Sequence, residues 1–151
     1  MANMLNETFK VLFTRDLEKL KQEIQAYQNE KRIWYIENSI SNSAGNLCLH
    51  LIGNLNTYIG TQLGKTSYLR NREAEFALKN IPREELLAQV EKTIMMISET
   101  FDQISEEQLR ETYPGETPLK EASTHHFLVH LAMHLAYHLG QINYHRRLLD
   151  N

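Results

Sequence analysis

Apolar residues recur at helical spacing in four stretches of the chain. An α-helix turns by about 100° per residue, so side chains three or four positions apart lie on one face. Three prolines and six glycines, placed mostly between these stretches, leave little room for a sheet. We therefore expect an all-α protein, a four-helix bundle with two long connections at about residues 29–43 and 63–81, forming one domain over residues 1–151. The spacing predicts helices over about residues 4–28, 43–62, 82–101 and 122–149.

Local signals support the ends of these helices. Ser43 suits the N-cap of the second helix, and Gly64 lies just beyond its end. Pro82 suits the first position of the third helix, and two glutamates follow in the first turn. The segment SEEQL before Pro114 predicts one further short helical turn, whereas RIWYI alternates too briefly to predict a strand.

Four histidines follow one another at four-residue intervals in the last helix: His126, His130, His134 and His138. Each four-residue step rotates the side chain by about 40° around the helix axis. Two consecutive histidines can therefore bind the same metal ion, but the first and last lie about 120° apart and cannot. The position of the buried face decides which pair is suited to a site.

The apolar positions of this helix select the pair His134 and His138. The buried face is predicted from Leu128, Leu131, Leu135, Leu139, Ile142 and Leu149. Relative to Leu135, His138 lies at about −60° and His134 at about −100°, so both lie at the edge of that face. His130 at about −140° and His126 on the opposite side turn toward solvent.

His50 lies at the edge of the apolar face of the second helix and supplies a third imidazole. With His134 and His138 it forms a predicted site for a divalent ion, with Zn²⁺ or Ni²⁺ expected. Three protein ligands leave a coordination position open, which is typical of catalytic zinc sites. The alternative is that these are surface histidines or hydrogen-bonded core histidines without an ion.

Polar neighbours of the three histidines have two interpretations each. Gln141, one turn beyond His138, either supports a ligand histidine or packs at a helix interface. Asn46 and Asn54 lie one turn either side of His50, where they either serve the site, by orienting the ring of His50 or lining the pocket, or pack against another helix. His145 lies about 10 Å along the axis from His138, so we expect a structural role for it.

Charged residues in the second long connection also have two interpretations. A loop containing Arg70, Arg72 and Glu75 would be able to close over the site and bind an anionic substrate. A solvated run of charges is the interpretation that we favour from sequence.

Composition excludes several classes of function. The net charge is −3, and charged residues of both signs are interspersed along the chain. We therefore expect no nucleic-acid partner. The chain has no apolar run long enough for a membrane span and no signal peptide, so we expect a cytoplasmic protein without a membrane partner. The single cysteine, Cys48, excludes an intramolecular disulfide and is expected to be a small buried residue.

Three other catalytic classes lack their residues. A zinc protease motif needs glutamate directly after the first histidine of the pair, but Leu135 follows His134. Di-iron bundles need Glu-x-x-His pairs on two helices, and the sequence has none. A Ser-His-Asp hydrolase lacks its nucleophile elbow.

Three segments of the chain resemble the DinB-like (YfiT-like) superfamily of metal-binding four-helix bundles: SAGNLCLHLIGNL, NREAEF and HLAMHLAYHLGQINYHRR. The resemblance covers essentially the whole chain. It implies that His50, His134 and His138 bind the metal. It also implies a metal-dependent transferase or isomerase that uses a low-molecular-weight thiol, or a metal-dependent hydrolase, acting on a small-molecule substrate.

Two classes of function follow from these observations. The first is a metal-dependent thiol S-transferase or hydrolase; the second is a non-catalytic metal-binding bundle with a role in stress response or interaction. The resemblance also implies a homodimer. Apolar residues beyond one face, Ile52 and Ile59 on the second helix and Met95 and Met96 on the third, are expected to form the partner surface.

Overall fold

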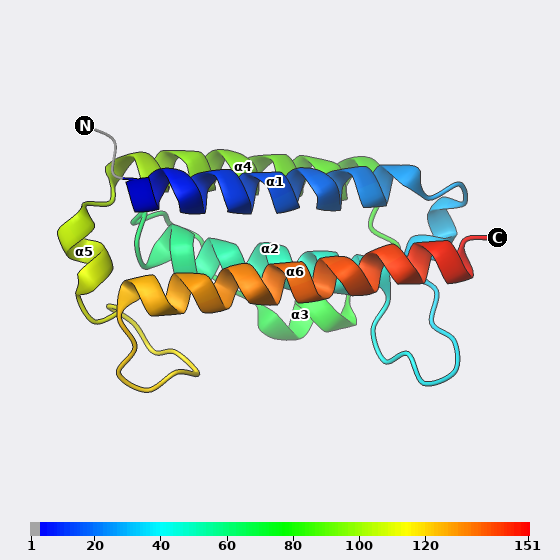
Figure 1. Cartoon of the computed structure of the whole chain (residues 1–151). Helices are drawn as coiled ribbons and strands as arrows, with labels where there is room; N and C mark the ends of the chain where they lie inside the picture. The colour runs from blue at the N-terminus through cyan, green and yellow to red at the C-terminus, as the bar shows by residue number, and fades with distance from the viewer. Residues whose placement is uncertain (1–3) are drawn as a thin grey trace.

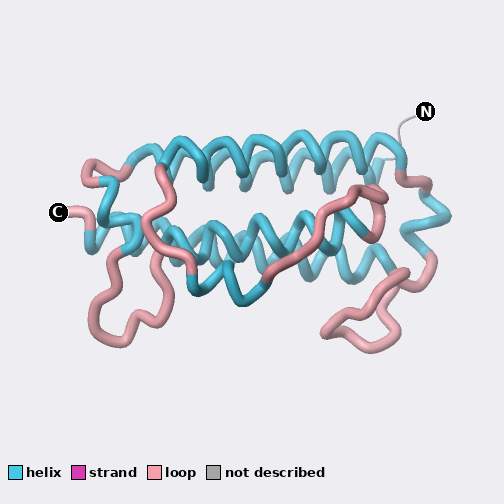
Figure 2. Tube along the Cα trace, turned by 180° about the vertical axis from the view of Figure 1, so that it is seen from behind, coloured by secondary structure: helices cyan, strands magenta, loops and turns pink. Residues whose placement is uncertain are grey.

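Four long helices form the body of the protein in a computed structural model that describes residues 4–151. Figure 1 shows α1 and α4 side by side in one layer, and α2 and α6 in the other. Figure 2 shows the same helices from behind, with loops and no strand among residues 4–151. The all-α bundle predicted from apolar spacing is confirmed. The long helices are α1 (Met4–Ala26), α2 (Ala44–Leu55), α4 (Arg83–Gln103) and α6 (Thr124–Leu149).

The direction of the helices explains one long connection. In Figure 1, α1 and α6 run toward the same end of the bundle, and α2 and α4 run toward the other. Because α2 and α4 are parallel, the chain between them has to return along the length of the bundle. This returning segment includes α3 (Arg72–Ala77), which packs against α2. The sequence did not predict α3, since six residues are too few to show helical periodicity.

Short elements complete the connections. The segment RIWYI contributes to a 3₁₀ helix, η1 (Glu30–Trp34), and is not a strand. SEEQL forms α5 (Glu106–Arg110), and Ser105 and Gln108 make a capping box at its start. The short helical turn predicted there is confirmed.

The second predicted helix has two parts. Ser43 is its N-cap, because the Ser43 hydroxyl accepts a hydrogen bond from the Asn46 amide at 3.1 Å. The α-helical hydrogen bonding ends at Leu55, and a π-helical segment, η2 (Asn56–Thr61), continues the helix. The wider turn of a π-helix is not visible in apolar spacing.

The core lies between the two layers of helices. Phe9 and Phe13 of α1 stack on Phe101 of α4, with ring centroids 5.9 and 5.8 Å apart. The predicted face of α6 is buried at Leu128, Leu131, Leu135 and Ile142. Cys48 is a free, buried cysteine, as expected.

The residues proposed for a partner surface require a correction. Ile52, Ile59 and Met96 are only 5, 0 and 7% exposed within the protomer, whereas Met95 is 56% exposed. The prediction was wrong for the first three. α2, which carries Ile52, contacts α3, α4 and α6 and is buried on every face, and η2, which carries Ile59, contacts α4, which carries Met96. Ile52, Ile59 and Met96 therefore pack within the core of the protomer. The homodimer itself stays a prediction.

None of the described helices has the length and apolar character needed to cross a lipid bilayer.

His145 joins the end of α6 to the segment after α1. Its Nε2 donates to the Tyr35 carbonyl at 2.8 Å, and its Nδ1 accepts from the Tyr27 hydroxyl at 2.6 Å. Burial lowers the pKa of His145, although the bond to Tyr35 and the charge of Asp150 act in the opposite direction. The imidazole is 5% exposed, and this burial favours its neutral form.

The lowered pKa of His145 predicts a pH dependence of stability. Between the folded pKa and the unfolded value of about 6.5, the unfolded chain binds more protons. The free energy of unfolding should therefore fall as the pH drops through that window. His145→Gln, which does not titrate, should weaken this dependence in urea denaturation across the pH range. Equal slopes for the wild type and the variant would contradict the prediction.

Candidate metal centre

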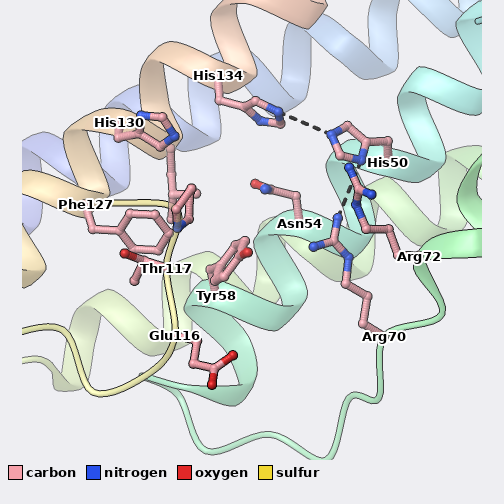
Figure 3. A pocket seen from close by; sticks show the side chains of 12 residues that line it. His50, Asn54, Tyr58, Arg70, Arg72, Glu116, Thr117, Phe127, His130 and His134 are labelled. Carbon is pink, nitrogen blue, oxygen red and sulfur yellow. Dashed lines mark hydrogen bonds between the residues drawn. The ribbon is translucent and has the colours of Figure 1, made fainter. Parts of the chain in front are cut away.

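Three histidines from two helices meet between α2 and α6. His50 comes from α2, and His134 and His138 come from α6. One ring nitrogen from each lies within 4.8 Å of the other two. The Nε2 atoms of His50 and His134 are 3.2 Å apart, and Figure 3 shows these two rings facing each other. The structure thus brings together the three residues that the helical rotation selected.

The other histidines of α6 lie outside this group. His130 stacks on Phe127 with ring centroids 5.8 Å apart, and it lines the same cavity as His134. His126 is exposed, one turn further from the centre. The rotation of about 40° per four residues accounts for this gradual turn away from His50.

Two of the three histidines have a defined partner for Nδ1. The Nδ1 of His50 donates to Glu75 Oε1 at 3.1 Å, and the Nδ1 of His138 donates to Gln141 Oε1 at 2.7 Å. A proton fixed on Nδ1 leaves the Nε2 lone pair available to a metal ion. The Nδ1 of His134 is buried and has no hydrogen-bond partner among the described residues.

The surroundings favour the uncharged form of His134 and His138. Burial, followed by the nearby charges of His138, His50, His130 and Arg70, lowers the pKa of His134 to about 4. Burial also lowers the pKa of His138, although the bond to Gln141 opposes this shift. At neutral pH these two imidazoles are therefore neutral, with one ring nitrogen free of a proton, which is the form that binds metal ions.

Glu75 is the residue of this centre whose contact with His50 the sequence did not reveal. Its side chain is 6% exposed and accepts hydrogen bonds from Arg70 Nε at 2.9 Å and Arg70 Nη2 at 3.0 Å, in addition to the one from His50. Burial raises the pKa of Glu75, but the bonds from His50 and Arg70 outweigh burial and lower it overall. The interpretation of Arg70 and Glu75 as a solvated charge run is therefore wrong, because α3 folds back onto α2.

A glycine in α2 makes room for this carboxylate. A Cβ built on Gly53 would lie 2.6 Å from Glu75 Cδ and still closer to Oε2. Asn46 fixes the backbone of α3, since its Nδ2 donates to the Glu75 carbonyl at 2.9 Å and the Leu78 carbonyl at 2.8 Å. Of its two interpretations, Asn46 thus packs against a neighbouring helix. Two features of the sequence could have indicated this contact between α3 and α2. Gly53 interrupts the apolar residues of α2, and Asn71 is a residue type suited to cap α3.

A cavity of about 450 Å³ lies beside the histidines. Its walls come from α2, η2, α6, the start of α3, the segment before α3 and the loop between α5 and α6. Asn54 lines it, and Figure 3 shows its side chain pointing into the cavity. The Asn54 Oδ1 is buried and accepts no hydrogen bond from the part of the chain that the structure describes. The lining residues are His50, Asn54, Tyr58, Arg70, Arg72, Glu116, Thr117, Pro118, Phe127, His130, Leu131 and His134.

Gly53→Ala should destabilise the protein by about 1–3 kcal/mol or more, because the added methyl group overlaps the Glu75 carboxylate. Gly140→Ala is the matched control: its Cβ meets nothing within 4 Å. Alanine at this exposed helical position should stabilise by roughly 0.5–1 kcal/mol. Chemical denaturation of both variants measures the two effects. Equal stability of the two variants would contradict the close approach of Glu75 to α2.

Comparison with known proteins places the chain in a family. A family model described as "Protein of unknown function (DUF1572)" matches residues 3–151. No curated protein and no solved structure matches the chain. The match covers almost the whole chain, including all three clustered histidines and Glu75. The protein therefore belongs to the DUF1572 family.

Proposed function

We propose that this protein is a metal-dependent enzyme of the DinB-like superfamily. His50, His134 and His138 would bind one divalent ion, with Zn²⁺ or Ni²⁺ expected. The observation that carries the proposal is the meeting of three imidazole nitrogens within 4.8 Å, beside a cavity of about 450 Å³.

The donor set fits such an ion. Nitrogen ligands suit both Zn²⁺ and Ni²⁺, and the bonds from Nδ1 of His50 and His138 resemble the outer partners of known metal-binding histidines. When bound, a divalent ion lowers the pKa of a water or thiol that it carries and so supplies a nucleophile at neutral pH. The metal site would be of the catalytic type, since three protein ligands leave a position for substrate.

The surrounding residues would bind and orient a small-molecule substrate. The cavity volume lies within the range of about 300–1,000 Å³ that is usual for small-molecule sites. Asn54 offers a polar group inside this cavity, and Gln141 orients His138. Glu75 positions His50; both of its oxygens accept hydrogen bonds, so it is poorly suited to act as a general base.

The reaction that we propose is thiol-dependent S-transfer or hydrolysis, with a low-molecular-weight thiol as cosubstrate for the transferase. The resemblance of the His50 and HLGQI segments to DinB-like proteins supports this class. The alternative, a non-catalytic metal-binding bundle, would be favoured by a sealed site or a fourth protein ligand. The adjoining cavity favours the enzyme. The homodimer and the cytoplasmic location stay predictions.

The wild-type chain should bind about one divalent ion, as measured by elemental analysis and calorimetric titration. His50→Ala and His134→Ala should each weaken binding by more than about 100-fold, because loss of an outer partner alone costs about 10–100-fold. His126→Ala, at an exposed position of the same helix, is the control and should leave affinity unchanged. Full metal content in His50→Ala would reject this site.

Catalysis is tested separately with the loaded protein. Zn²⁺- or Ni²⁺-loaded wild type should accelerate the reaction of small thiols with electrophiles, or hydrolysis, and the His134→Ala variant should not. Activity can be screened by loss of free thiol and by release of a chromogenic leaving group. A protein that binds one ion and turns over none of these substrates would support the non-catalytic alternative.

A further inference from the structure

Among the described residues, one of the two arginines that line the cavity beside the histidines has no acidic partner. The two arginines are Arg70 and Arg72. The guanidinium of Arg70 is committed to the Glu75 carboxylate through two hydrogen bonds. Arg72 has no carboxylate partner among the described residues; its recorded contact is with the ring of Phe76, 5.5 Å from Cζ to the centroid.

Contacts through the ring of Phe76 place the Arg72 guanidinium beside the metal centre. Phe76, under Arg72, packs against the ring of His50 with centroids 5.0 Å apart. Figure 3 shows Arg70 and Arg72 on the His50 side of the cavity, while Thr117 and Phe127 lie on the other side. Arg72 and the Nε2 atom of His50 therefore belong to the same part of the cavity.

The charges of the cavity favour an anion at Arg72. The three histidines contribute no negative charge, and Glu75 is already paired with Arg70. Among the lining residues of this cavity the one acidic side chain is Glu116, which comes from the loop before α6 and is exposed. A bound divalent ion would add positive charge at the His50 side and strengthen the attraction for an anion there.

Asn54 adds a second binding group. Its Oδ1 is buried and has no hydrogen-bond partner within residues 4–151, and the residue is 7% exposed, yet its side chain points into the cavity (Figure 3). A buried amide without a partner costs free energy, which a polar ligand group would recover. A ligand that reaches from the histidines to Arg72 would bring polar atoms past this amide.

We propose that the substrate of this site carries an anionic group, of carboxylate size, that pairs with Arg72 while its reactive end lies at the three histidines. Arg72 is thus the residue that selects anionic substrates. A planar guanidinium binds a carboxylate through two parallel hydrogen bonds, which a neutral or cationic group does not accept. This inference rests on the proposed metal-dependent function.

The test uses three thiols of similar length that differ at the far end: mercaptobutyrate, mercaptobutanol and aminobutanethiol. Each is titrated calorimetrically into Zn²⁺-loaded protein, and metal content is measured on the same samples. Wild type should bind mercaptobutyrate about tenfold more tightly than mercaptobutanol, and aminobutanethiol most weakly. Arg72→Gln should abolish this preference without changing metal content.

Two further variants serve as controls. Arg147→Gln removes a guanidinium that also lies over an aromatic ring, that of Tyr144 at 5.2 Å, but outside this cavity, and should keep the preference. Glu116→Gln should strengthen mercaptobutyrate binding, because it removes negative charge from the cavity wall. Equal binding of the three thiols, or a preference that survives Arg72→Gln, would overturn the inference alone. Wild-type protein that takes up no metal would overturn the proposed function and this inference together.

Discussion

The buried carboxylate of Glu75 is the interaction on which the site depends. A carboxylate at this depth is unfavourable unless it is paired and hydrogen-bonded. Here it accepts bonds from His50 and twice from Arg70, so three groups from α2, the returning segment and α3 are fixed relative to one another. The hydrogen bond from His50 to Glu75 also holds the proton of His50 on Nδ1. Removing His50 or Arg70 would leave the buried charge of Glu75 without one of its hydrogen-bond donors. The positions of these side chains therefore depend on the charge of Glu75.

The glycine under Glu75 shows how the bundle makes room for this interaction. α2 is buried along its whole length, since α3, α4 and α6 each cover part of it. A side chain at Gly53 would separate α3 from α2 and move the carboxylate away from His50. Glycine is unfavourable within a helix, but Gly53 is tolerated in α2 because it allows α3 to approach closely.

Apolar spacing predicted the four long helices because apolar residues recur at helical intervals in each of them, and Ser43 marks the start of α2. It also selected His50, His134 and His138, since the rotation of an α-helix relates every position to the buried face. The role of Glu75 was not predictable in this way, because α3 is short and its position depends on a contact with Gly53 from a distant part of the chain. The burial of Ile52 and Ile59 was missed for a related reason: periodicity within one helix does not say how many neighbours surround it.

The separation of His50 and His134 along the chain has a consequence for the order of folding. These residues are 84 positions apart along the chain. Their helices, α2 and α6, are held in place by contacts with other helices as well as with each other. In an unfolded chain, closing so long a loop around one ion costs conformational entropy, whereas the assembled bundle has already met that cost. An ion would therefore enter a finished cavity rather than direct the chain toward it, and the helices would assemble first by burying their apolar faces.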